Sequence, residues 1–169
     1  LRMLLFNEIE KIEIAFRQTV ANVTAQMSGN IFWMTDVSSY SNSSKAAKSI
    51  TLITNEYNKS REDFIEHFKR TYTDPFPPAW ITAEILPLGN MTWLYSNLAD
   101  QRSRKAIAKT FHLQAPVLDS WMTVITLTRN SCCHHARMWN KINPIIPNDM
   151  KNDFKNKLTG ILNLFPEID

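Results

Sequence analysis

Apolar residues in the first 26 positions recur at steps of three and four, the spacing of one face of an α-helix. The pattern predicts a helix from residue 2 to about residue 26. After Gly29, a stretch rich in Ser and Asn is typical of a loop and continues to Ser44. The apolar series of the predicted helix consists of Leu5, Ile9, Ile12, Phe16, Val20 and Val23.

A second helical pattern begins at Ser44, a residue type that caps helix N-termini, and runs to about Tyr72. The sequence Asp-Pro-Phe-Pro-Pro at residues 74–78 ends it, because proline cannot continue a helix. The chain is therefore expected to hold one long helix between the loop and this proline cluster.

The remaining pattern predicts several more helices. One begins at Ala79 after Pro78 and is bent or broken by Pro87 and Gly89. Asp100 is placed to cap a short basic helix. The expected later helices cover residues 101–111, a segment starting at Pro116, and residues 148–164.

These elements predict an all-α fold. The whole chain has only three glycines, where average composition would give roughly twelve, so it has few of the turns that hairpin-rich sheets favour. Long helices joined by short turns favour an antiparallel helical bundle with additional short helices. We expect one domain over residues 1–169. The chain opens on Leu1 inside a running helical pattern, from which we expect that an N-terminal helical portion is missing.

Neither a membrane span nor a disulfide framework is expected. No apolar run reaches the roughly 18 residues that a transmembrane helix needs. The two cysteines, Cys132 and Cys133, are adjacent and cannot pair with each other without severe distortion. We therefore expect a cytoplasmic protein.

Positive charge is concentrated in one part of the chain. Residues 101–148 contain seven Lys or Arg and a single acid, Asp119, whereas the whole chain has a net charge of +3. Such an imbalance attracts phosphates, although a solvated basic surface is the alternative interpretation. The basic residues are Arg102, Arg104, Lys105, Lys109, Arg129, Arg137 and Lys141.

The segment from Arg129 to Asn140 gathers groups that can bind protons and phosphate. On a helical wheel with Arg129 at 0°, His134 lies at about 140° and Arg137 at about 80°, so the three share one face. Asn130 and Asn140 lie on that face too, while His135 lies at about 240°. His134 is therefore the better catalytic candidate, unless the helix is distorted.

Two other interpretations of the Cys-Cys-His-His run at residues 132–135 compete with catalysis. Four consecutive helical residues spread over about 300° and cannot converge on one tetrahedral zinc ion, so we expect no metal and no cofactor. A histidine pair beside Trp139 can also simply pack within the bundle. The nearby Arg129, Asn130 and Arg137 favour a chemical role.

These residue types suit metal-independent cleavage of RNA. The ribose 2′-hydroxyl can attack the neighbouring phosphate, which requires a group that transfers a proton and a cation that neutralises the growing charge. Histidine and arginine supply these functions. DNA lacks the 2′-hydroxyl and would be inert to this route.

At these residues the chain resembles the Abi-like family of abortive-infection proteins, which includes the AbiD and AbiF types and whose catalytic domain is of the HEPN kind. The superfamily motif is an Arg and a polar residue with a His four to six residues after the Arg, as in Arg129-Asn130 with His134 or His135. Further matching segments, in the family's order, are Leu1-Arg2, Ile12-Glu13, Arg17, Pro78-Ala-Trp80, Glu84, Gly89, Ser120-Trp121 and residues 134–140.

The resemblance implies a HEPN-like bundle and a toxin-like phage-defence endoribonuclease. Two copies would pair as a homodimer and form a composite site whose products carry 2′,3′-cyclic phosphates. Glu13 and Arg17 either support the site or form a bundle-stabilising ion pair, and Trp80 and Trp121 are interpreted as core residues rather than RNA-stacking platforms.

Specific roles follow from this hypothesis. Arg129 and His134 would be catalytic, Asn130 would orient the site, His135 could share proton transfer, and Arg137 would hold phosphate. Lys141, Arg102, Arg104 and Lys105 would bind RNA, and an inhibitory RNA or antitoxin protein is a further expected partner. The alternatives are a non-catalytic RNA-binding HEPN module and a purely structural dimerisation domain.

Overall fold

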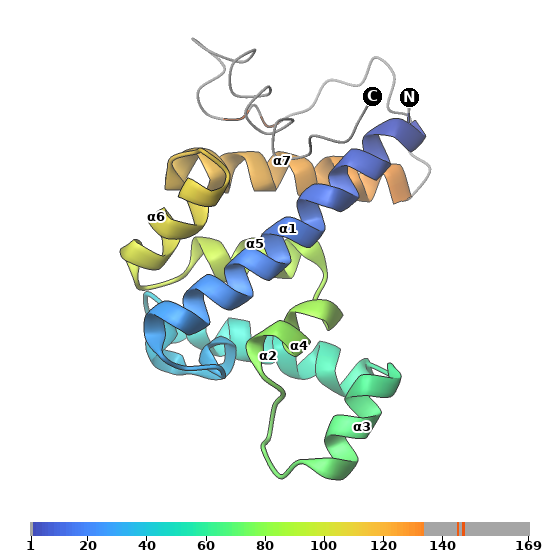
Figure 1. Cartoon of the computed structure of the whole chain (residues 1–169), viewed down its shortest axis with the longest axis vertical. Coiled ribbons are helices and arrows are strands. Elements are labelled where there is room, and N and C mark those ends of the chain that lie inside the picture. Colours follow the sequence, from blue (N-terminus) through green and yellow to red (C-terminus); the bar gives the residue numbers. More distant parts are fainter. Residues whose placement is uncertain (1, 134–144, 146, 148–169) are drawn as a thin grey trace.

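The computed structural model describes residues 2–133, 145 and 147, and these form an all-α helical bundle (Figure 1). The sequence prediction of the fold class is thus confirmed. The elements are α1 (Arg2–Ser28), the 3-10 helices η1 (Trp33–Thr35) and η2 (Val37–Ser39), α2 (Ser43–Lys59), α3 (Asp63–Thr71), α4 (Ala79–Ile85), α5 (Leu88–Ser96), α6 (Gln101–Thr110) and α7 (Ala115–Cys133).

Helix α1 is the long central element, and it packs against α4, α5, α6 and α7 (Figure 1). Its predicted apolar stripe supplies Phe16 and Val20, which are fully buried. The ring of Phe16 meets that of Tyr95 edge to face, with the centroids 5.6 Å apart. Phe16 and Val20 belong to one hydrophobic core with buried residues of α2, α4, α5, α6 and α7.

The connection between α1 and α2 is more ordered than a loop pattern suggests. It contains η1 and η2, and Trp33 is fully buried with its indole N–H donating to the Ala21 carbonyl at 3.2 Å. The cap of α2 also differs from the prediction. Asn42, not Ser44, is the N-cap, and its side-chain oxygen accepts from the Lys45 N–H at 2.9 Å.

The expected single helix from residue 44 to residue 72 is wrong. It is divided into α2 and α3, because Ser60 and Glu62 adopt extended backbone angles between them. Helix α3 carries its own charge pattern, with Asp63 and Glu66 in its first turn and basic residues in its last. Acids at the N-terminus and bases at the C-terminus stabilise a helix through its dipole, so this charge pattern indicates a separate helix. A prediction from apolar spacing alone does not use it.

The predicted break near Pro87 is confirmed. Helix α4 begins at Ala79 directly after Pro78, and α5 begins at Leu88 directly after Pro87. In both cases the N-cap residue is a proline, and its φ of −53° at Pro78 and −56° at Pro87 is the value that the proline ring fixes. The break lets α4 and α5 pack at different positions along α1.

Helix α6 has the predicted cap. Asp100 accepts a hydrogen bond from the Arg102 backbone N–H at 3.0 Å, and this bond is the main cause that lowers the pKa of the Asp100 carboxyl. At the other end, His112 has a φ of 54°, and its N–H donates to Lys109 O while Leu113 N–H donates to Ala108 O. The turn therefore has the hydrogen bonds of a Schellman motif.

Helix α7 then begins at Ala115, one residue before the predicted start. Within the described part of the chain there is no strand, and one isolated antiparallel bridge joins Tyr40 and Leu98. None of the helices described there combines the length and the apolar character needed to cross a membrane. The helix predicted at residues 148–164 lies outside the described residues.

Candidate functional site

Two of the predicted catalytic residues lie in the last turns of α7. Arg129 is partly buried, with its side chain 34% exposed, and Asn130 is exposed. His134 and His135 follow Cys133 in the sequence and lie outside the described residues. The predicted phosphate-binding residues Arg137 and Lys141 lie outside them as well. The structure therefore places the arginine of the motif and its polar neighbour, and the proton-transfer residues stay a prediction.

The Glu13 carboxylate connects Arg129 to α1. Its Oε2 accepts from Arg129 Nε at 3.3 Å, across 116 residues of sequence. Its Oε1 accepts from Arg17 Nε at 3.2 Å and also from a terminal nitrogen of the same guanidinium. Both resembling segments, Ile12-Glu13 with Arg17 and Arg129-Asn130, thus meet at one carboxylate.

Arg17 is also bound to the end of α4. Its Nη1 donates to the carbonyl oxygens of Ala83 and Leu86, in the segment where the chain leaves α4 before Pro87. The side chain of Arg17 is only 11% exposed and that of Glu13 12%. We conclude that Arg17 links α1 to α4, and that Glu13, which binds both arginines, links α1 to Arg129 on α7.

The three residues have an unequal charge balance. One carboxylate faces two guanidinium groups, so the Glu13–Arg17–Arg129 cluster keeps one net positive charge. Glu13 contacts only Nε of Arg129. The two terminal nitrogens of Arg129 have no hydrogen-bond or ion-pair partner among the residues that the structure describes. A planar guanidinium held at Nε in this way can present both terminal groups to a phosphate.

A small hollow of about 160 Å³ lies at this cluster. Its lining has three carboxylates and two guanidinium groups, so the hollow as a whole carries a formal net charge of −1 although the Glu13–Arg17–Arg129 cluster is positive. A phosphate would be repelled from the acidic part and attracted to the exposed side of Arg129. The lining residues are Phe6, Glu10, Glu13, Ile14, Arg17, Glu84 and Arg129.

The predicted RNA-binding residues of α6 have different surroundings. Arg102 is largely exposed and pairs with its neighbour Asp100, and Lys105 is exposed. Arg104 is mostly buried, and its Nη2 donates to Asp119 on α7 at 2.9 Å. Its guanidinium also lies 5.4 Å from the centre of the Tyr95 ring. Arg104 therefore joins α6 to α7, and it is less available to RNA than Arg102 or Lys105.

The interpretation of Trp80 as a core residue is wrong, because 40% of its surface is exposed. Ala79, the residue before it, is buried, and consecutive residues of a helix lie about 100° apart, so Trp80 lies on a more exposed side of α4. Trp121 is half-buried on α7. Periodicity could not settle Trp80, because α4 has only seven residues and its apolar pattern spans barely two turns.

The structure is thus an all-α bundle in which a nearly buried carboxylate on α1 holds the arginine of an Arg-polar motif near the end of α7. A family model described as Abi-like protein matches residues 1–140. The chain belongs to the Abi-like protein family, as its sequence resemblance predicted. Membership supports a role in abortive infection, a form of phage resistance. No curated protein and no solved structure matches the chain.

Proposed function

We propose that this protein is a metal-independent endoribonuclease that acts in abortive infection. In this reaction, the ribose 2′-hydroxyl attacks the adjacent phosphorus while the bond to the 5′-oxygen breaks. The products are a 2′,3′-cyclic phosphate and a 5′-hydroxyl. Arg129 neutralises the charge that grows on the non-bridging oxygens, and His134 transfers the proton that the 2′-hydroxyl loses to the departing 5′-oxygen.

The observation that carries this proposal is the way Arg129 is held. Its Nε is bound to Glu13, whose carboxylate is almost buried and is itself bound by Arg17. The guanidinium plane is therefore oriented before substrate arrives, while its terminal nitrogens have no described partner. Fixed donors of this kind stabilise a developing oxyanion without reorganisation during the reaction.

Glu13 is accordingly a positioning residue in this proposal, and Arg17 supports Glu13. The same contacts stabilise the bundle, so a structural and a functional role coincide in these two residues. Asn130 is exposed next to Arg129 and would orient the scissile phosphate. His135 is proposed to share proton transfer, and Arg137 and Lys141 are proposed to bind phosphates.

Pairing of two copies belongs to the same proposal. A homodimer would place two Arg129–His134 motifs in one cleft, so each phosphate would meet two arginines. Cytoplasmic RNA is the proposed substrate, and an inhibitory RNA or antitoxin protein is proposed to restrain activity before infection. Once this inhibitor is released in the cell, the protein would cleave RNA and growth would stop.

A non-catalytic RNA-binding module is the second candidate function. It is favoured by α6, where Arg102, Lys105 and Lys109 are all exposed on one short helix. Both candidates predict that RNA affinity falls steeply with salt, because each neutralised phosphate releases counterions. Only the ribonuclease requires His134.

The ribonuclease proposal is tested with a labelled structured RNA incubated with purified protein in EDTA, followed by analysis of the product ends. We expect cyclic phosphates at the cut sites. A matched RNA with a 2′-deoxy nucleotide at the main cut site should stay intact there, because the attacking hydroxyl is missing. Cleavage that persists at the deoxy position would overturn the proposed mechanism.

A further inference from the structure

A second hollow, of about 390 Å³, opens between α1, α3 and α4. Two large aromatic side chains line it, Phe64 from α3 and Trp80 from α4, and about 40% of the surface of each is exposed. Gln18 and Asn22 from α1 and Ile81 and Glu84 from α4 complete the lining. The volume lies within the range of about 300–1,000 Å³ that small-ligand pockets occupy.

Hydrogen bonds hold the polar side of this aromatic hollow in place. The Asn22 amide donates to Gln18 Oε1 at 3.3 Å, and the Gln18 amide donates to Glu84 Oε1 at 3.1 Å. Oε2 of Glu84 has no partner among the described residues. Oε1 keeps a second lone pair beside the bond from Gln18, so both oxygens of this oriented carboxylate can accept hydrogen bonds from a ligand in the hollow.

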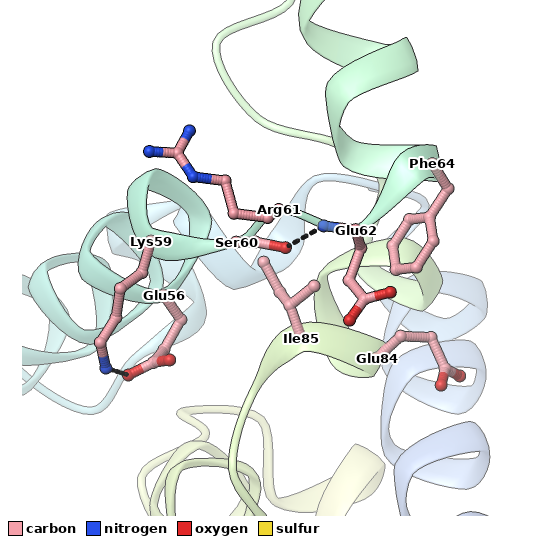
Figure 2. Close-up of a pocket in the computed structure, with 8 residues that line it drawn as sticks. All are labelled: Glu56, Lys59, Ser60, Arg61, Glu62, Phe64, Glu84 and Ile85. Carbon is pink, nitrogen blue, oxygen red and sulfur yellow. Dashed lines mark hydrogen bonds and ion pairs between the residues drawn. The ribbon is translucent and has the colours of Figure 1, made fainter.

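The charge of the aromatic hollow determines what it can bind. Glu84 is its one charged residue within the described part of the chain, and no Lys or Arg lines it there. Figure 2 shows the neighbouring hollow, which shares Phe64 and Glu84 with this one, and there the guanidinium of Arg61 points away from both shared residues. A phosphate would be repelled, but a flat, neutral group with N–H donors would be attracted.

We propose that the aromatic hollow binds a guanine base of the RNA substrate, an inference that rests on the proposed ribonuclease function. The Watson–Crick edge of guanine carries two adjacent donors, N1–H and the 2-amino group, which a carboxylate accepts together. Adenine, cytosine and uracil each place an acceptor beside their donor on this edge. Phe64 and Trp80 supply stacking surfaces, as aromatic side chains do for unpaired RNA bases.

The aromatic hollow adjoins the Arg129 cluster, because Glu84 lines both hollows. A guanine bound beside Glu84 would therefore place its backbone toward the exposed side of Arg129. The base would enter an acidic aromatic pocket, and the phosphate would meet the guanidinium. This division predicts cleavage of single-stranded RNA with a preference for phosphates next to guanine.

Binding is tested by calorimetric titration with guanosine, inosine and adenosine 5′-monophosphates, which share the same phosphate. We expect guanosine monophosphate to bind most tightly. Inosine monophosphate lacks the 2-amino group and should bind more weakly, and adenosine monophosphate more weakly still. Trp80→Ala should lower the affinity for guanosine monophosphate by roughly tenfold or more, since stacking on an aromatic side chain changes affinity by about 5- to 160-fold.

Two carboxylate variants form a matched pair. Glu84→Gln should abolish the preference for guanosine over adenosine monophosphate, because an amide no longer offers two acceptor oxygens. Glu62→Gln should keep the preference, because Glu62 is an exposed carboxylate that lines the neighbouring hollow but not this one. With RNA substrates, the guanine preference in cut sites should disappear in Glu84→Gln and persist in Glu62→Gln.

Equal binding of guanosine and adenosine monophosphates, or an unchanged preference in Glu84→Gln, would overturn the proposal. So would an arginine-containing peptide that binds at Glu84 while guanosine monophosphate does not. The nucleotides have no internucleotide bond, so their binding does not depend on cleavage. If the protein binds guanosine monophosphate through Glu84 but cuts no RNA, only the ribonuclease proposal is wrong. If it cuts RNA without a guanine preference, only the proposed base site is wrong.

Discussion

At the scale of single residues, the site depends on how one carboxylate is shared. Glu13 binds Arg17 through one oxygen and Arg129 through the other, and both Glu13 and Arg17 are nearly buried. Arg129 is consequently held at Nε while its terminal nitrogens are free of described partners. Only a guanidinium can do this, because its Nε donates to Glu13 while its two terminal nitrogens remain available as donors; an ammonium group has its three donors on one nitrogen.

The first prediction concerns Arg129→Lys. Lysine keeps the charge but cannot bind Glu13 and present two further fixed donors at once, so RNA cleavage should fall by about 100- to 1,000-fold, the usual cost of losing an oxyanion donor. Single-turnover rates measure this, and circular dichroism checks the fold. Wild-type rates in the lysine variant would show that only the charge of Arg129 matters.

The second prediction compares two glutamates on α1. Glu13→Ala leaves the nearly buried Arg17 and the partly buried Arg129 without their carboxylate, so the free energy of unfolding should fall by about 3 kcal/mol. Glu8→Ala removes only the exposed pair with Lys11 and should cost less than about 1 kcal/mol. Urea unfolding measures both, and similar losses would contradict a special role for Glu13.

At the scale of elements, the ends of helices separate what the sequence could predict from what it could not. Asp100, Pro87 and the start at Ala79 were predictable, because caps and prolines act through adjacent backbone. The division of α2 from α3 was missed, because the seven-residue step from Tyr57 to Phe64 keeps the period of one helix, although the charge pattern of α3 indicates a separate one. The Glu13–Arg129 contact also escaped prediction, since spacing within one helix carries no information about which helix will face it.

The third prediction uses two helix ends that require left-handed backbone. Gly29 has a φ of 67° and His112 a φ of 54°. Gly29→Ala should destabilise the protein by about 1 kcal/mol, and His112→Gly should stabilise it by about 0.5–1 kcal/mol, because only glycine adopts this conformation without steric cost. Thermal and urea unfolding test the pair. Two changes of the same sign would argue against backbone strain as the cause.

The fourth prediction concerns the α6 cap and pH. The Arg102 backbone N–H lowers the pKa of Asp100 below its ordinary value of 3.8 in the folded protein. A lowered folded pKa means that the charged carboxylate stabilises the fold above pH 3.8 and that this stability is lost as pH falls through the folded pKa. The stability of wild type over Asp100→Asn should therefore stay constant above about pH 5 and shrink in urea titrations as the pH falls through 3.8 and on through the lower folded pKa, whereas a constant difference throughout would refute the assignment.

At the scale of the whole molecule, the described bundle brings together segments from both ends of its sequence. Helix α1 supplies Glu13 and Arg17, α4 anchors Arg17, and α7 supplies Arg129. The all-α class could be predicted because amphipathic spacing and scarce glycine act along the chain. The exposure of Trp80 could not, because it depends on how α3 and α4 lie beside α1.

The most direct test of the proposed ribonuclease measures RNA affinity and single-turnover cleavage side by side in EDTA, for wild type and His134→Ala. We predict an unchanged Kd and a fall in the cleavage rate of at least about 100-fold, since His134 moves a proton and Arg129 still meets the phosphate. Equal cleavage by both proteins would contradict the account and assign the activity to another residue or to a contaminating nuclease.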